Sequence, residues 1–209
     1  MTLGELFLSG GWLMWPLLAL GAIAVFIFVE RWVAIRRASK MDETFMNRIR
    51  DYIVEGRINV AVDLCRKTDT PIARMIEKGI ERLGRPVGDV QNAIENLANL
   101  EVSKLESGLP FLATIAGGSP MIGFLGTVIG MVQAFMKLSA AGGSIDMNLL
   151  SSGMYVAMIT TVGGLLVGIP TYFGYNYLVS RVEKLVFRME AHSIAFMDIL
   201  NQPARKPLT

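Results

Sequence analysis

The chain has 209 residues, of which 52% are hydrophobic and only 18% are charged, and this balance is too apolar for an ordinary soluble domain with a solvated surface. The net charge of +2 is small, and the basic residues of the central region are interleaved with acidic ones, which argues against a protein that binds DNA or RNA. A membrane protein is the class that these numbers favour.

Three long runs without charged side chains predict three transmembrane helices. The runs are Leu6 to Val29, Ser107 to Met136 and Met147 to Ser180. Each exceeds the ~20 residues that a helix needs to cross the core of a bilayer. We therefore expect an all-α protein with a first transmembrane helix at 1–35, a cytoplasmic helical domain at 36–107, a second transmembrane helix at 108–137, a periplasmic loop at 138–147, a third transmembrane helix at 148–180 and a cytoplasmic helical tail at 181–209.

The distribution of Lys and Arg predicts the orientation of these helices. Apart from Lys137, all of the 20 basic residues lie within 31–104 or 181–206. Basic segments are retained on the cytoplasmic side, so the N-terminus and the 138–147 loop should be outside. No basic region or small-residue cleavage site accompanies the first apolar run, so we expect it to stay in place as an anchor rather than to be removed as a signal peptide.

The cytoplasmic segments are predicted to be helical because apolar residues recur in them at helical spacing. Thr70 followed by Pro71 is typical of a helix start, with threonine as the cap and proline in the first turn. The tail at 181–209 continues the third span as an inside helix.

The second span is expected to continue a cytoplasmic helix. From Asp89 onward the helical pattern meets no strong breaker before Gly108 and Pro110. One long helix should therefore run from the cytoplasm into the bilayer, with Pro110 and Pro120 tolerated as kinks.

Residue types that carry enzyme chemistry are scarce. The single cysteine, Cys65, excludes an intrachain disulfide, and the single histidine, His192, is most simply a surface or packing residue. We find no metal-ligand cluster, no nucleophile paired with a base in a recognisable motif and no phosphate-binding loop. We therefore expect no enzyme activity, no cofactor and no metal site.

Small side chains form a stripe along each of the last two spans, because residues three and four apart share a helix face. The stripe of the second span consists of Ala116, Pro120, Gly123, Thr127, Gly130 and Ala134, and that of the third consists of Gly153, Ala157, Thr160, Gly164 and Gly168, with Thr161 beside it. Small residues let membrane helices approach closely, so helix packing is the simpler interpretation.

The threonines of these stripes permit a second interpretation. A threonine hydroxyl can bond to a carbonyl of its own helix, which explains one such residue more easily than Thr127, Thr160 and Thr161 together. A small and weakly polar face can also line a pore or hold a partner helix. No Asp, Glu, Lys, Arg or His lies inside the uncharged runs of these two spans, although proton relays depend on such groups. If the chain conducts protons, the titrating group must come from another protein.

Two stretches carry a family resemblance. SPMIGFLGTVIGMVQAF at 119–135 and MITTVGGLLVGIPTYFGYN at 158–176 resemble the paired signatures of the ExbB/TolQ/MotA proton-channel family, and those of ExbB most of all. The VERW stretch at 29–32, the outside N-terminus and the large inside loop also resemble the ExbB layout. The MotA branch is disfavoured, because it has four spans and three are predicted here.

The resemblance implies a pentamer whose second and third helices enclose a central pore in the bacterial inner membrane. The pore would hold the helices of a single-span partner, ExbD, which carries the essential Asp, and proton movement would drive rotation that energises outer-membrane transport through TonB. The family's pore threonines match Thr127 and Thr161. With the stripes, the expected pore-lining residues are Thr127, Thr161, Thr160, Gly123 and Val156, and the expected helix-packing residues are Pro120, Gly126, Gly130, Gly164, Gly168 and Pro170.

One position departs from the family pattern. Many ExbB and TolQ proteins have a Glu fourteen residues before the proline of the third-span motif, and counting back from Pro170 leads to Val156. The nearest polar side chain is that of Tyr155, whose phenol is neutral at physiological pH. This substitution argues against a mechanism in which the large subunit itself binds the proton.

Other interpretations stay open. The chain could be a TolQ-like subunit that serves envelope integrity, or a helical membrane scaffold whose glycine stripes only pack subunits together. A transporter that works alone is disfavoured, because three spans show no inverted repeat and no charge at mid-membrane.

Overall fold

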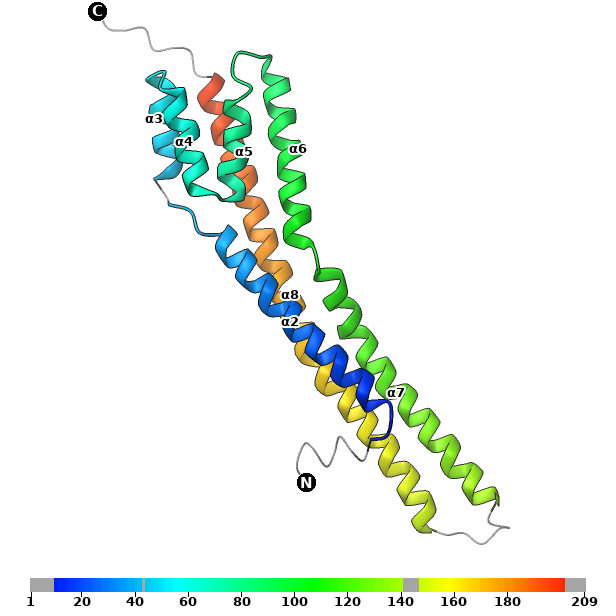
Figure 1. Cartoon of the computed structure of the whole chain (residues 1–209). Coiled ribbons are helices and arrows are strands. Elements are labelled where there is room, and N and C mark those ends of the chain that lie inside the picture. Colours follow the sequence, from blue (N-terminus) through cyan, green and yellow to red (C-terminus); the bar gives the residue numbers. More distant parts are fainter. Residues whose placement is uncertain (1–9, 43, 141–146, 202–209) are drawn as a thin grey trace, which may run out of the picture. The chain divides into compact units, whose positions relative to one another are not determined.

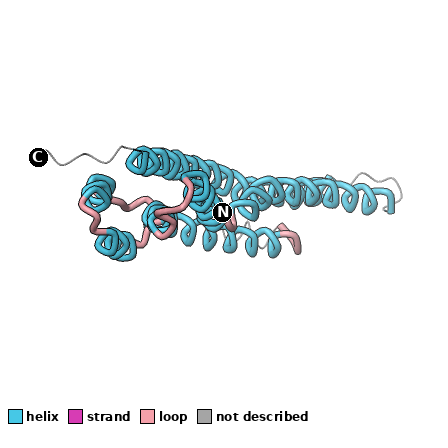
Figure 2. The backbone as a smooth tube through the Cα atoms, turned by 90° about the horizontal axis from the view of Figure 1, so that it is seen from above, coloured by secondary structure: helices cyan, strands magenta, loops and turns pink. Residues whose placement is uncertain are grey.

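The structure of the chain, a computed structural model, describes residues 10–42, 44–140 and 147–201 (Figure 1). Every regular element in this part of the chain is an α-helix, which confirms the prediction of an all-α protein (Figure 2). The helices are α2 (Met14–Ala38), α3 (Phe45–Val54), α4 (Ile58–Thr68), α5 (Pro71–Ile80), α6 (Val87–Glu106), α7 (Leu109–Ala140) and α8 (Met147–Asn201). The N-terminus, most of the predicted periplasmic loop and the end of the tail lie outside the described residues.

Three segments of the described chain are long and apolar enough to cross a membrane. They are α2, the segment formed by α6 and α7, and α8. The three predicted spans are thereby confirmed, and the helix of the third continues well beyond its uncharged run, to Asn201. The 55 residues of α8 make it the longest element described.

The chain divides into two compact units, described in turn below. The first contains the part of α2 that ends at Glu30, together with Gly108–Leu178. The second contains Arg31–Ser107 and the part of α8 that begins at Val179. The apolar helix segments therefore gather in the first unit and most of the charged residues in the second.

The predicted continuous helix from Asp89 into the second span is interrupted at Ser107 and Gly108. Gly108 has a φ of +86°, a left-handed conformation that breaks the helical hydrogen-bond ladder and that glycine adopts at little cost. Pro110 consequently lies in the first turn of α7, where its missing N–H would have had no helical partner. Pro120 does lie inside α7 as expected.

In the first unit α2 packs on α8 where glycines remove side chains from the contact. A Cβ atom placed on Gly163 would lie 2.9 Å from the sulfur of Met14, and one on Gly174 would lie 3.0 Å from the ring of Phe28. These separations are shorter than ordinary van der Waals contacts, so a larger residue at either position would force Met14 or Phe28 to shift. Most other large side chains of α2 are exposed, as expected for a helix that faces lipid.

The second unit is a bundle in which α3, α4, α5 and α6 contact one another in chain order. Thr70 caps α5 as predicted, since its hydroxyl accepts a hydrogen bond from the backbone N–H of Ala73 at 3.3 Å. Gly79 of α5 makes room for two core side chains. A Cβ atom there would lie 2.6 Å from the ring of Phe196 on α8 and 2.8 Å from Ile94 on α6.

A buried carboxylate joins three segments of the second unit. Glu101 of α6 is 2% exposed and accepts hydrogen bonds from Arg74 of α5 and, at 2.8 Å, from Lys104. Burial raises the pKa of Glu101, but the hydrogen bonds and charges of Arg74 and Lys104 outweigh it, so the pKa lies below its ordinary value. Arg74 also pairs with Asp69, in the turn between α4 and α5.

Cys65 and His192, the chain's single cysteine and single histidine, both lie in this unit. Cys65 is fully buried, and desolvation, followed by the charge of Glu77, raises the pKa of its thiol to about 12. His192 is half-buried, and burial, followed by the charge of Arg188, lowers the pKa of its imidazole. Both groups are therefore uncharged at neutral pH.

Candidate pore helices

The small residues of α7 and α8 meet each other within the chain. The buried positions of α7 recur every three or four residues, and so do those of α8. On α7 they include Ala116, Ser119, Gly123, Gly126, Gly130 and Ala134, and on α8 they include Ala157, Thr160, Gly164 and Gly168. The two stripes predicted from the sequence thus face one another in a single subunit.

The approach of α7 and α8 brings backbone against backbone. A Cβ atom on Gly164 would lie 2.5 Å from the carbonyl oxygen of Ser119 and 3.0 Å from the Cα atom of Gly123. One on Gly123 would lie 2.9 Å from the carbonyl oxygen of Thr160. Backbone atoms cannot move aside as a flexible side chain can, so these two positions require glycine. Close van der Waals contact of this kind holds membrane helices together, because the hydrophobic effect does not drive helix association inside lipid.

The same contact continues toward both ends of the helices. A Cβ atom on Gly168 would lie 2.6 Å from the ring of Pro120, and one on Gly130 would lie 2.9 Å from the side chain of Ala157. At Gly126 an added Cβ atom would overlap the hydroxyl of Thr160. Five of the six predicted helix-packing positions therefore lie where α7 and α8 touch.

Pro170, the sixth of these positions, lies elsewhere. It lines a cleft of about 230 Å³ in the first unit, together with Ala24, Val25 and Phe28 of α2, Leu112 of α7, and Thr171 and Gly174 of α8. Its surroundings are apolar and include α2, which the sequence pattern of the last two spans alone does not reveal. Its role in packing stays a prediction.

Each of the three threonines donates its hydroxyl hydrogen to a backbone carbonyl. Thr127 donates to Phe124 at 2.6 Å and Thr160 donates to Ala157 at 2.7 Å, both within their own helix. Thr161 donates across to the carbonyl oxygen of Gly123 on α7 at 3.1 Å. A hydroxyl used in this way still has oxygen lone pairs with which to accept a hydrogen bond.

The threonines differ in how accessible those oxygens are. Thr127 and Thr161 are half-buried at the edge of the contact between α7 and α8, whereas Thr160 is 2% exposed. Val156 is half-buried, and its carbonyl oxygen lies 3.4 Å from the hydroxyl of Thr160. The edge of the contact thus offers two hydroxyl oxygens and no carboxylate.

Ser119 is a polar residue of this contact that the sequence pattern did not single out. Its side chain is fully buried and its hydroxyl has no hydrogen-bond partner among the described residues. The sequence does contain an indication of this position, because Ser119 lies four residues before Gly123 and therefore on the same helix face as the predicted stripe.

Comparison with known proteins bears directly on these helices. The sequence profile of the MotA/TolQ/ExbB proton channel family matches residues 67–191, which include all of α7 and most of α8. This chain belongs to that family. Its members are channel and transport components rather than enzymes, which agrees with the lack of catalytic groups noted above.

The relatives of this chain within the MotA/TolQ/ExbB family include proteins named ExbB and proteins named TolQ. A biopolymer transport protein ExbB homologue of Methanothermobacter thermautotrophicus is 28% identical over 190 residues, which are 90% of this chain and 67% of that protein. The Tol-Pal system protein TolQ of Pseudomonas aeruginosa is 27% identical over 200 residues, which are 90% and 86% of the two chains.

Another relative has a higher sequence identity over a shorter stretch. The Tol-Pal system protein TolQ of Haemophilus influenzae is 44% identical over 91 residues, which are 43% of this chain and 40% of that protein. The match thus spans less than half of that relative. Because ExbB and TolQ names both occur, the comparisons establish the proton channel family and leave the branch undecided.

Proposed function

We propose that this chain is the large, ExbB-type subunit of an inner-membrane motor driven by the proton-motive force, in which an ExbD-like partner supplies the titrating carboxylate and a TonB-like protein receives the work. The subunits would form a homopentamer with the N-terminus in the periplasm and the tail in the cytoplasm. The observation that supports this most is the edge of the α7–α8 contact. There Thr127 and Thr161 present hydroxyl oxygens, and the uncharged runs 107–136 and 147–180 in which they lie contain no carboxylate of their own.

The hydrogen bonds of these threonines favour one protonation state of a visiting carboxyl group. Because Thr127 and Thr161 use their hydrogens on carbonyl oxygens, their lone pairs can only accept. A protonated carboxylic acid has an O–H to donate, whereas a carboxylate has only acceptors. The face would therefore stabilise the neutral acid inside the membrane, where a charge is costly, and would release it again when a proton is lost to water.

The energy available is sufficient for mechanical work. One elementary charge that crosses a potential of 100 mV releases about 2.3 kcal/mol. Several protons passing in succession could therefore drive a step of the partner helix relative to the pentamer. Pro120, Gly126, Gly130, Gly164, Gly168 and Pro170 would keep each subunit rigid during that step. Gly123 and Thr160, which were expected to line the pore, lie buried in the α7–α8 contact and would support the pore wall from behind, while the half-buried Val156 would complete the pore surface.

A TolQ-like role is the second candidate, and the TolQ relatives favour it. The pore chemistry would be the same in both cases. The difference would lie in the single-span partner and in the protein that receives the work, namely a TonB-like protein for nutrient uptake or an envelope-integrity system. The nature of a co-expressed partner separates the two.

Replacing both Thr127 and Thr161 by valine is expected to reduce proton flux about tenfold, the size of a 1.4 kcal/mol change. Valine keeps the shape of threonine but offers no oxygen to the partner's carboxyl group. The measurement is proton uptake by liposomes that contain the chain and its co-expressed partner, under an applied potential. The same double variant should still co-purify with the partner.

The matched control for this double variant is Thr114→Val. Thr114 also donates to a carbonyl of its own helix, that of Pro110 at 2.9 Å, but its side chain is exposed away from the contact with α8. Its replacement should leave the flux unchanged. Equal flux in the double variant and the wild type would contradict a pore role for the hydroxyls and would favour the scaffold interpretation.

A further inference from the structure

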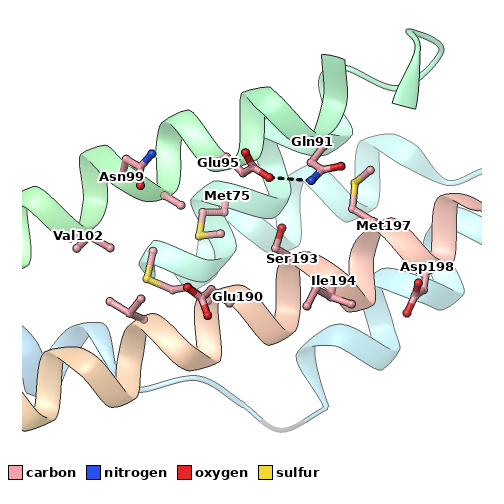
Figure 3. A pocket seen from close by; sticks show the side chains of 13 residues that line it. Met75, Gln91, Glu95, Asn99, Val102, Glu190, Ser193, Ile194, Met197 and Asp198 are labelled. Atoms are coloured by element: carbon pink, nitrogen blue, oxygen red, sulfur yellow. Dashed lines mark hydrogen bonds between the residues drawn. The ribbon is translucent and has the colours of Figure 1, made fainter. Parts of the chain in front are cut away.

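The second unit contains a groove between α6 and α8 that the pore account does not use. Figure 3 shows its side chains, which come from both helices and, at the floor, from α5. The groove has a volume of about 570 Å³. The residues used below are Met75 at the floor, Glu95 on α6, and Glu190, Ser193, Ile194 and Asp198 on α8.

The groove is acidic. Glu95, Glu190 and Asp198 line it, and no Lys or Arg does. Glu95 accepts a hydrogen bond from Gln91 at 2.8 Å (Figure 3), and none of the three carboxylates forms an ion pair with any residue that the structure describes. Elsewhere in this unit acidic side chains do find basic partners, as Glu77 does with Arg66. Three unneutralised carboxylates at one groove favour a basic ligand.

The groove also offers apolar surface to a ligand. Met75 and Met189 are buried at its floor, whereas Ile194 is 63% exposed. Phe187 does not line the groove, but it lies seven residues before Ile194 on the same face of α8 and is 70% exposed. Methionine adapts its shape to different partners, and the apolar side chains of a groove can contact the apolar face of a helix laid into it.

We propose that this groove binds the basic, amphipathic cytoplasmic segment that flanks the membrane span of the single-span partner. The identity of that partner rests on the proposed function. Its charge follows from a general rule, because Lys and Arg are enriched on the cytoplasmic side of a membrane span. The groove lies in the unit that carries most of the chain's own basic residues, so the same rule places it in the cytoplasm.

Two other occupants make different predictions. A second copy of the chain would bring interleaved acidic and basic residues rather than a basic face. The chain's own residues 202–209, which contain Arg205 and Lys206, lie outside the described part and would compete with an added ligand. Both are separated from the proposed partner by the cross-linking experiment below.

The first test uses a synthetic amphipathic peptide of about 18 residues, roughly five helical turns, with leucine on one face and lysine on the other. Its binding to the full chain in neutral detergent is followed by fluorescence anisotropy. The peptide should bind the wild type, and the triple variant Glu95→Lys, Glu190→Lys, Asp198→Lys should bind about tenfold or more weakly, because three attractive exposed pairs become repulsive. A scrambled peptide of the same composition should bind less well than the amphipathic one.

The control is the double variant Glu106→Lys, Glu183→Lys. These two carboxylates are exposed on α6 and α8 but do not line the groove. Their reversal should change the affinity by no more than the general change in net charge produces. Absence of peptide binding, or an equal loss of affinity in both variants, would overturn the proposal.

The second test identifies the occupant in the assembled complex. Ser193→Cys places a thiol in the groove, and the native Cys65 gives little background because it is fully buried and its pKa is about 12. A bismaleimide should link this thiol to cysteines introduced along the partner's cytoplasmic segment. In parallel samples a second cysteine is introduced within residues 202–209 of the chain. Links to that cysteine or to Ser193→Cys of a second copy, in place of links to the partner, would overturn the proposal.

The groove proposal and the motor proposal can fail independently of each other. If protons flow and the partner co-purifies but no cross-link to the partner forms, the groove proposal fails alone. If the cross-link forms while the flux is absent or insensitive to the threonine substitutions, the motor proposal fails and the docking site stands.

Discussion

Gly164→Val is expected to destroy the folded membrane unit. The first added carbon would lie 2.5 Å from the carbonyl oxygen of Ser119 and 3.0 Å from the Cα atom of Gly123, and both obstacles are backbone. The helices would have to separate along their whole contact, at a cost of about 3 kcal/mol or more. Size-exclusion chromatography and the thermal midpoint of the purified protein in detergent measure this loss.

A matched substitution shows whether the effect belongs to the contact or to glycine in general. Gly118→Val is on α7, and a Cβ atom at Gly118 would meet nothing within 4 Å. Its replacement should leave folding and assembly close to those of the wild type. If Gly164→Val and Gly118→Val behaved alike, the close approach of α7 and α8 would not be what holds the unit together.

Arg74→Met is expected to be the most damaging single change in the second unit. It leaves Glu101 buried with Lys104 as its only remaining partner. We expect a loss of about 2 kcal/mol, less than for a fully buried pair, because the Arg74 side chain is 37% exposed and Lys104 remains. The thermal midpoint of the variant, compared with the wild type at neutral pH, measures it.

The same variant should change the dependence of stability on pH. The pKa of Glu101 is lowered in the folded state, so its contribution is present above the unfolded carboxyl pKa of about 4.3 and is lost as the pH falls through the folded pKa. Without Arg74, burial is opposed less and the folded pKa rises toward the unfolded value, so the loss of stability on acidification is smaller and is complete at a higher pH than in the wild type.

Two further variants act as controls for this pair. Arg48→Met removes an exposed pair with Asp42 and should change stability by less than about 0.5 kcal/mol. Adding Glu101→Gln to Arg74→Met should recover part of the loss, because the uncompensated charge is gone. A loss in Arg74→Met no larger than that in Arg48→Met would contradict the role given to the buried network.

The all-α class and the three membrane-spanning segments could be predicted from the sequence, because long uncharged runs have few alternatives in a bilayer. The interruption at Gly108 could not. Glycine is compatible with both a helix and a left-handed turn, and only the packing on either side decides which one forms. For the same reason the sequence predicted a kink at Pro110, whereas this residue lies in the first turn of α7.

The candidate site was predictable in its composition but not in its contacts. Periodicity placed Gly123, Gly164 and their neighbours on two faces, yet it could not tell whether those faces meet each other or another subunit. The structure shows that they meet within one chain, with Thr160 buried between them and Thr161 bonded to Gly123. The acidic groove escaped prediction because α6 and α8 are far apart in the sequence.

The central claim is that the edge of the α7–α8 contact faces an enclosed axis that receives a foreign acidic helix. The most direct measurement is an experimental structure of the chain purified with its co-expressed single-span partner. The account predicts that Thr127 and Thr161 of every subunit face that axis and that the partner's membrane carboxyl group lies within hydrogen-bond reach of one of them. A structure in which both threonines face lipid, with the axis filled by bulky side chains of this chain, would contradict it.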